Sequence, residues 1–433
     1  MSADRAGRTS GSGSTDPGPA SVQVGQTAFV TGPRTIRWTP WRFVTVFGVV
    51  SLLSDVVYEG ARSVIGPYLA TFGASAALVG LVTGAGEATA LAGRLVTGPL
   101  ADRTRAYWPL VVVGYAVTMA AVPALGLTTA LWLAAALFVA ERAGKAIRGP
   151  ARDVMISHAA AAVGRGKGFA VHEALDQTGA VAGPLLVAAV LAATAHNYRP
   201  AFFALAVPAV AGMLVLLWLR AGVPDPRRFE PGPRPGAPPA PPGRQLPRVF
   251  WTYLAFTVLT TAGYATFGVL SFHLATRHVV PVPVVPVVYA AAMGIAALAA
   301  LASGWLYDRV GVRVLVVVPV LTALIPLAAF TTTSATAVAG VLVWGAVLGL
   351  QESTMRATIA DIVPAARRGT AYGIFAAGLG GATLVGGLLT GALYGYSITA
   401  VIVTVAGIQA AALALFLAIV RPVARARLPR AGG

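Results

Sequence analysis

Apolar segments of about 20 residues follow one another along the chain, and this pattern restricts the fold more than any other feature. A helix of that length crosses the hydrocarbon core of a bilayer. Only 11% of the 433 residues are charged, whereas a soluble domain carries about 25%. We therefore expect an all-α polytopic membrane protein with twelve transmembrane helices near residues 41–63, 76–98, 108–126, 129–149, 170–192, 200–219, 249–273, 284–304, 313–330, 335–357, 370–392 and 397–420.

The segments fall into two sets of six, separated by a stretch rich in Pro, Gly and Arg that is typical of an extended linker. The N-terminal residues are rich in Gly, Ser and Pro and lack the apolar core of a signal peptide. The expected parts are a disordered cytoplasmic tail at 1–40, a six-helix bundle at 41–220, a cytoplasmic linker at 221–248, a second bundle at 249–420 and a basic cytoplasmic tail at 421–433.

Basic residues predict the orientation in the membrane. Lys and Arg are concentrated in alternate loops, the linker and both tails, whereas the intervening loops hold only Arg199 and Arg277. We therefore expect both termini in the cytoplasm and the protein in the plasma membrane. The net charge of +17 then reflects this topology and attraction to anionic lipid headgroups, not binding of nucleic acid.

The sequence offers little for catalysis or metal binding. It contains no cysteine, which excludes disulfides and thiolate ligands, and His172 has no neighbouring His to complete a metal site. No nucleotide-binding loop or Ser-His-Asp arrangement is recognisable. We expect no enzyme activity, metal or cofactor; a polytopic membrane sensor or enzyme is the non-transport alternative.

A short motif occurs twice, each time between two apolar segments and about half a chain apart. The copies are residues 98–105 (GPLADRTR) and 304–313 (GWLYDRVGVR). A second matching pair, Arg148–Asp153 and Arg356–Asp361, ends the fourth and tenth segments. Repeats at corresponding places in two sets of helices indicate a duplicated membrane protein.

The first motif is similar to the loops after the second and eighth helices of major facilitator superfamily transporters, where the pattern is approximately Gly-x-Leu-x-Asp-Arg-x-Gly-Arg-Arg. The N-terminal copy has Thr104 and Arg105 where the Gly-Arg pair falls, and the other copy keeps Gly311. The resemblance covers the chain from about Trp41 to Val420. It implies two pseudo-symmetric six-helix bundles, a cavity lined by helices 1, 4, 7 and 10, and secondary transport by alternating access. Since one chain holds both bundles, we expect it to act as a monomer.

Ionisable residues lie inside several predicted spans, where a charge facing lipid costs several kcal/mol. On the first helix Asp55, Glu59 and Arg62 share one face, and Glu87 lies at a comparable depth on the second. Carboxylates that repel one another in a cavity can exchange protons, so Asp55, Glu59 and Glu87 are the proton-coupling candidates. The alternative is a fixed Arg62–Glu59 ion pair. The charge partners expected in the cavity are Arg62, Arg94, Glu141, Arg142, Lys145 and Glu352.

Charges near the predicted cytoplasmic helix ends are candidates for a gate. The resemblance implies this role for Asp102, Arg103, Asp308 and Arg309. The matching ends of equivalent helices add Arg148, Asp153, Arg356 and Asp361, and the start of the fifth helix adds His172, Glu173 and Asp176. Such groups can pair across the inner mouth.

The C-terminal half is rich in aromatic residues instead. Candidates for substrate contact are Tyr264, Phe267, Tyr289 and Trp344, together with Gln351; packing in the core is the alternative. On the fifth helix, residues 179–184 (GAVAGP) resemble part of a motif of drug–proton antiporters, whose physical content is close helix approach through small residues.

These patterns predict proton-coupled efflux of a small amphiphilic molecule. The alternatives are proton-coupled uptake, or export of an organic anion or metal chelate, in which Arg62, Arg142 and Lys145 hold a carboxylate. The expected partners are a small-molecule substrate, protons or another ion, and the lipid bilayer.

Overall fold

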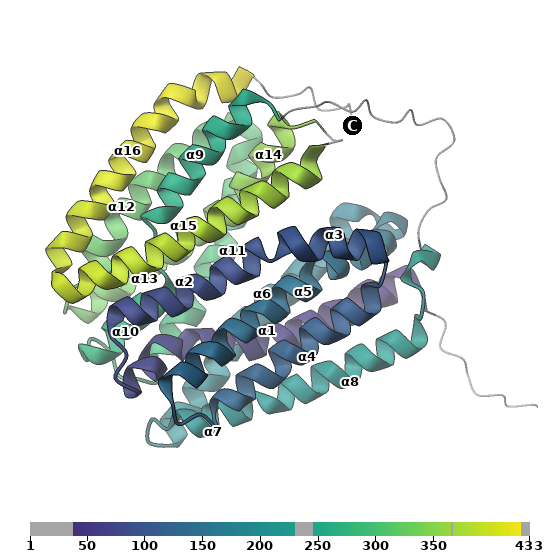
Figure 1. Ribbon diagram of the computed structural model, residues 1–433, viewed down its shortest axis with the longest axis horizontal. Helices are drawn as coiled ribbons and strands as arrows, with labels where there is room; N and C mark the ends of the chain where they lie inside the picture. The colour runs from purple at the N-terminus through teal and green to yellow at the C-terminus, as the bar shows by residue number, and fades with distance from the viewer. Residues whose placement is uncertain (1–37, 230–245, 365–366, 426–433) are drawn as a thin grey trace, which may run out of the picture. The chain divides into compact units, whose positions relative to one another are not determined.

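The structure is a computed structural model that describes residues 38–229, 246–364 and 367–425 (Figure 1). In these ranges the chain consists of helices joined by short loops and contains no strand. Ten stretches are long and apolar enough to cross a membrane. One of them, Val284–Ala329, contains two successive helices, and Leu131–Val163 is excluded from the ten by its charged residues. The described part of the chain therefore holds twelve helical segments of membrane length, as the sequence predicts, and we call each of these segments a rod.

The first six rods form the N-terminal half, with one apolar core of their own. They are α1 (Pro40–Thr71), α2 and α3 (Ala76–Ala92 and Arg94–Thr104), α4 (Tyr107–Leu125), α5 (Leu131–Val163), α6 (Arg165–Ala193), and α7 and α8 (Tyr198–Ala204 and Ala206–Gly222); a 3-10 turn, η1 (Pro226–Phe229), follows.

The other six rods form the C-terminal half around a second core. They are α9 and α10 (Arg248–Ala262 and Phe267–Thr276), α11 (Val284–Val310), η2 and α12 (Gly311–Val316 and Val317–Ala329), α13, η3 and α14 (Ser334–Leu350, Gln351–Met355 and Arg356–Ile362), α15 (Arg368–Tyr396) and α16 (Ile398–Arg425). The element η3 is a π-helical turn inside the tenth rod.

Several helices extend beyond the membrane spans expected from the sequence. The first span was expected near 41–63, and α1 continues to Thr71. The fourth span was expected near 129–149, and α5 continues to Val163, so Arg152 and Asp153 lie on a helix. Met155, Ile156 and Ala159 are buried on this extension, which packs against η1. Burial of an apolar face thus carries the helix past Pro150.

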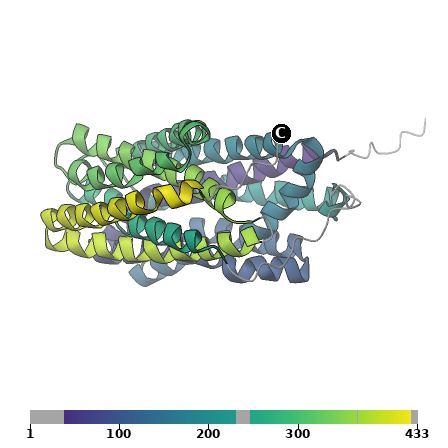
Figure 2. The ribbon, with the colours of Figure 1, turned by 90° about the horizontal axis from the view of Figure 1, so that it is seen from above.

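The two halves meet through α2 with α15, α1 with α10, and α6 with α11 (Figures 1 and 2). At the first contact Gly80 and Gly387 lie so close that a Cβ on either would collide with the backbone of the other. Gly391 opposes Ala76 in the same way. These contacts lie toward the end of the bundle that holds Thr71, Ala76 and Tyr396, which we call the far end; the end that holds Pro40 is the near end.

Candidate functional site

Charged side chains from three helices of the N-terminal half meet in its interior. Arg62 on α1 pairs with Glu87 on α2 at 3.0 Å and with Glu59 one turn away at 3.4 Å. Arg142 on α5 lies 3.7 Å from Glu87 and 3.1 Å from Glu141. We call these five residues the charge cluster. The predicted Arg62–Glu59 pair is present, but as one part of a larger network.

Arg142 is the most buried member of the charge cluster, with no exposed surface. Its Nε and Nη1 atoms lie near carboxylates, yet none of its three guanidinium nitrogens forms a hydrogen bond of good geometry. A buried guanidinium depends on paired charges for its stability. Arg142 therefore has Glu87 and Glu141 as its compensating charges, and through Glu87 it links α5 to α2.

Tyr58 provides an aromatic platform that the sequence analysis did not single out. The Nζ of Lys145 donates a hydrogen bond to its hydroxyl at 3.0 Å and lies 4.3 Å from the ring centroid. The guanidinium groups of Arg142 and Arg148 lie 5.2 Å and 5.7 Å from the same ring. Cations over a ring face are stabilised by its quadrupole. Tyr58 follows Asp55 by three positions, and this helical spacing, which places it beside the charged face, is the signal in the sequence that could have identified it.

Asp55 differs from the other carboxylates of α1 and α2. Only 6% of its surface is exposed, and it has no hydrogen-bond or ion-pair partner among the residues that the structure describes. Its Cβ lies beside Gly179 on α6, where the absence of a side chain lets the two helices approach. Gly183 packs against Val56 one turn further along. The predicted close approach at residues 179–183 is therefore present, and it encloses Asp55.

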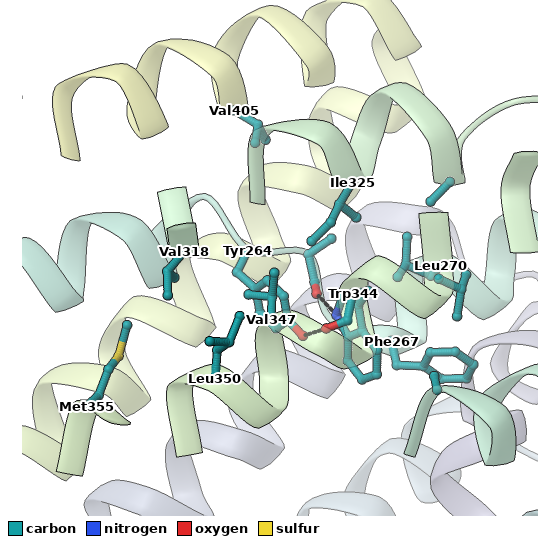
Figure 3. Close-up of a cluster of buried hydrophobic side chains, with 14 of the residues drawn as sticks. Tyr264, Phe267, Leu270, Val318, Ile325, Trp344, Val347, Leu350, Met355 and Val405 are labelled. Carbon is teal, nitrogen blue, oxygen red and sulfur yellow. Dashed lines mark hydrogen bonds between the residues drawn. The ribbon is translucent and has the colours of Figure 1, made fainter. Parts of the chain in front are cut away.

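The aromatic candidates of the C-terminal half form one buried cluster (Figure 3). Phe267 lies 4.3 Å from Tyr289 and 5.4 Å from Trp344, measured between ring centroids. Tyr264 stacks on Trp344 at 5.6 Å and donates a hydrogen bond to its carbonyl at 2.8 Å. The indole of Trp344 donates in turn to the carbonyl of Ala265 at 2.8 Å. In this conformation these residues therefore pack in the core, as the alternative interpretation expects.

One hydrogen bond joins the aromatic cluster to the charge cluster. The hydroxyl of Tyr289 on α11 donates to a carboxylate oxygen of Glu59 on α1, across the boundary between the halves. Thr83 and Thr266 form a second connection between the halves at 2.8 Å. Neither pairing was predicted, because the partners lie on different halves and far apart in the sequence.

The tenth rod contributes a polar group next to this region. Gln351 and Glu352 lie in the π-helical turn η3, where the helix widens. The side-chain nitrogen of Gln351 is buried without a hydrogen-bond partner. The Glu352 side chain is exposed and forms no hydrogen bond or ion pair with another described residue. The two candidates therefore differ, since Glu352 is accessible in this conformation and the side-chain nitrogen of Gln351 is not.

The gate candidates of the N-terminal half occupy two places. Arg148 is buried and donates to Thr118 at 2.6 Å and to Ser54 at 3.3 Å, so it connects α5 to α4 and α1. Arg152 pairs with Asp153 at 3.0 Å and lies 3.7 Å from Asp176.

The imidazole of His172 is 3.7 Å from Asp176 and 3.4 Å from the hydroxyl of Ser51. The remaining candidate on this helix, Glu173, is exposed and accepts a hydrogen bond from Gln177.

The duplicated motif occupies the near end of both halves. Asp102 and Arg103 are exposed in the last turn of α3. Asp308 and Arg309 are exposed at the end of α11, where Arg309 covers the ring of Trp305. Asp361 accepts a hydrogen bond from Tyr307 at 3.1 Å.

Two basic candidates remain to be placed. Arg356 is exposed at the start of α14, and Arg94 at the start of α3 packs against Gly149.

Comparisons with known proteins agree with this architecture. A family model described as Major Facilitator Superfamily matches residues 47–350 and 282–433. An uncharacterized protein of Mycobacterium tuberculosis is 54% identical over 391 residues, which cover 90% of this chain and 94% of that protein.

Solved structures of transporters share the fold. A bacterial homolog of the human lysosomal transporter Spinster, in an inward-facing and occupied conformation, matches with a TM-score of 0.69 at 16% identity over 91% of this chain and all (100%) of that chain. A mutant of the nucleoside transporter NupG matches with a TM-score of 0.70 at 13% identity, covering 87% of this chain and 99% of that chain.

Proposed function

Because the chain belongs to the Major Facilitator Superfamily, we propose that this membrane transporter couples proton movement to the export of a small amphiphilic molecule. The family accounts for transport of a small molecule without enzymatic chemistry. The coupling ion, the direction and the substrate class are our proposal, and they rest on the residues of the two clusters.

The observation that carries the proposal is the hydrogen bond from Tyr289 to Glu59. It joins a carboxylate of the N-terminal half to an aromatic cluster of the C-terminal half. An ionised carboxylate accepts a stronger hydrogen bond than a neutral one. Protonation of Glu59 would therefore weaken both this bond and the pairing with Arg62, and would favour separation of the halves.

Asp55 is the second proton acceptor in the proposal. A buried carboxylate without a hydrogen bond or paired cation is costly in its ionised form, and Asp55 has neither within the described ranges. It lies one turn from Glu59 on the same helix. A proton entering along this face would therefore meet Asp55 and Glu59 on one helix before the halves separate.

The substrate class follows from the residues opposite the charge cluster. Phe267, Tyr289 and Trp344 offer ring faces, and Gln351 and Glu352 offer polar groups on the adjoining rod. Rings with a few polar groups suit an amphiphilic molecule with an aromatic or cationic part. The rings are buried in the present conformation, so the proposal requires that separation of the halves exposes them to the substrate.

The test is proton flux in proteoliposomes during a screen of candidate substrates. The parent protein is compared with Asp55→Asn, Glu59→Gln and Glu87→Gln, and with Asp225→Asn as a control carboxylate in the exposed segment after α8. We expect substrate-dependent proton flux in the parent and the control. At least one of the Asp55, Glu59 and Glu87 variants should lose this flux but still bind the substrate. Substrate movement that persists in all three variants at any pH gradient would refute the coupling. Transport restricted to organic anions would favour the alternative in which Arg62, Arg142 and Lys145 hold a carboxylate.

A further inference from the structure

A cavity of about 660 Å³ lies at the near end of the N-terminal half, away from both clusters. Its walls are the start of α4, the end of α8 and the segment that follows α8. The indole of Trp108 on α4 donates a hydrogen bond to the carbonyl of Val223 at 2.9 Å and so fixes that segment in place. The cavity is thus built by a defined tertiary contact between two rods.

Three arginines line this cavity, namely Arg105, Arg220 and Arg227. Arg227 makes two hydrogen bonds to the carboxylate of Asp225, at 3.0 Å and 3.1 Å, and this pairing lowers the pKa of Asp225. The side chains of Arg105 and Arg220 form no hydrogen bond or ion pair with any residue of the described ranges. Within the described part of the chain, the cavity therefore carries two positive charges without a negatively charged partner.

The backbone at Arg105 points to a role for its side chain. Arg105 adopts a left-handed conformation with φ of 51°, at the C-cap of α3. The equivalent position of the second repeat is Gly311, which also has a positive φ, of 68°, but its ψ of −149° differs from the left-handed helical conformation of Arg105. Glycine adopts a positive φ without strain, whereas a residue with a side chain does so at a cost. The arginine at this position costs conformational energy that a glycine would not, and this points to a function for its charge.

An exposed apolar strip leads along α8 to the cavity. Val207, Val210, Leu214 and Leu217 recur every three or four residues and are strongly exposed, and Leu217 lines the cavity itself. On a membrane-spanning helix such a strip faces the lipid chains. The basic residues predict that this end of the bundle is cytoplasmic, where anionic lipids are concentrated.

We propose that this cavity binds the headgroup of an anionic phospholipid, with Arg105 and Arg220 on its phosphate and an acyl chain along the exposed strip of α8. A headgroup with an additional ammonium group would place a positive charge beside the arginines, so a net anionic headgroup is preferred over a zwitterionic one. Free inorganic phosphate shares the phosphate chemistry but lacks the apolar part.

The experiment is native mass spectrometry of the purified full-length protein titrated with dioleoylphosphatidylglycerol or dioleoylphosphatidylcholine. We expect the parent to bind phosphatidylglycerol more tightly. Arg105→Gly and Arg220→Gln should each weaken that binding about fivefold, because a basic residue near a lipid surface contributes about 1 kcal/mol. Arg105→Lys keeps the charge and should keep the preference, as should Arg277→Gln, which removes an exposed arginine at the far end.

Thermal unfolding distinguishes a lost site from a misfolded protein. Arg105→Gly removes the backbone strain and should unfold at the same temperature as the parent or higher. Equal binding of both lipids by the parent, or unchanged phosphatidylglycerol binding in Arg105→Gly and Arg220→Gln, would overturn the proposal. Displacement of phosphatidylglycerol by millimolar inorganic phosphate would assign the cavity to a soluble anion and overturn it as well.

Discussion

Removing the hydroxyl of Tyr289 should open the far end of the bundle. Tyr289→Phe deletes the hydrogen bond to Glu59 while the ring keeps its contact with Phe267. A hydrogen bond to a charged group contributes about 1.5–3 kcal/mol. If the bond exists only while the halves are closed at this end, its loss shifts the equilibrium toward the open state by about 10- to 150-fold.

The absence of cysteine from the sequence makes the assay direct. A single Val269→Cys, at a fully buried position beside Gly80, reports on access from the far end. In liposomes with one orientation, the rate of modification by a membrane-impermeant maleimide measures the open fraction. We expect that rate to rise by at least tenfold when Tyr289→Phe is added.

Two comparison variants make the result decisive. Tyr264→Phe removes a hydrogen bond of similar burial inside the C-terminal half and should leave the labelling rate unchanged. Gly80→Ala places a Cβ against the backbone of Gly387 and should raise the rate, which shows that the assay responds. A rate that rises with Gly80→Ala but not with Tyr289→Phe would refute the idea that Tyr289 holds the halves together.

Three further outcomes follow from the contacts described. Glu87→Gln should lower the unfolding free energy by roughly 2–4 kcal/mol, because it leaves Arg62 and Arg142 without their shared carboxylate. Asp55→Asn should change the unfolding free energy by less than about 1 kcal/mol, since no paired group is lost. Thermal unfolding in detergent compares the two variants, and equal losses would contradict the assigned pairings. Gln409→Leu removes both hydrogen bonds to Thr260, at 2.6 Å and 2.8 Å, and should lower the unfolding free energy by about 1–3 kcal/mol; an unchanged unfolding midpoint would refute this. Arg227 keeps the pKa of Asp225 below the ordinary value of 3.8, so the ion pair persists at neutral pH and is lost only when the pH falls through that lowered pKa. Phosphatidylglycerol binding should therefore be constant between about pH 5 and pH 8. A loss of binding within that window would contradict this expectation.

The sequence was sufficient for the features that depend on local pattern. Segment length and hydrophobicity predicted the twelve rods, and helical spacing placed Asp55, Glu59 and Arg62 on one face, of which Glu59 and Arg62 do pair. The spacing of Gly179 and Gly183 indicated a close helix contact, which occurs against α1. These inferences rest on periodicity along one helix, which a sequence contains explicitly.

The features that the sequence did not reveal depend on the rotation of one helix against another. The bond between Tyr289 and Glu59, and the use of Tyr58 as a platform for Lys145, require the relative rotation and depth of rods from different parts of the chain. A change of one residue in helical phase turns a side chain by about 100°. The extension of α5 to Val163 likewise depends on a tertiary contact, because the end of this helix packs against η1.

The π-helical turn at Gln351–Met355 makes the two repeated halves unequal in their tolerance of length changes. A π turn accommodates one residue more than an α turn without rotating the helix that follows. Deleting a residue within this turn would let α13 and α14 merge into a continuous α-helix, with Arg356 and Asp361 still on their present faces. The corresponding rod of the first half, α5, is unbroken, so the same deletion there would turn everything beyond it by about 100°. Among natural variants of this transporter, single-residue gaps should therefore accumulate in the tenth rod and be rare in the fourth.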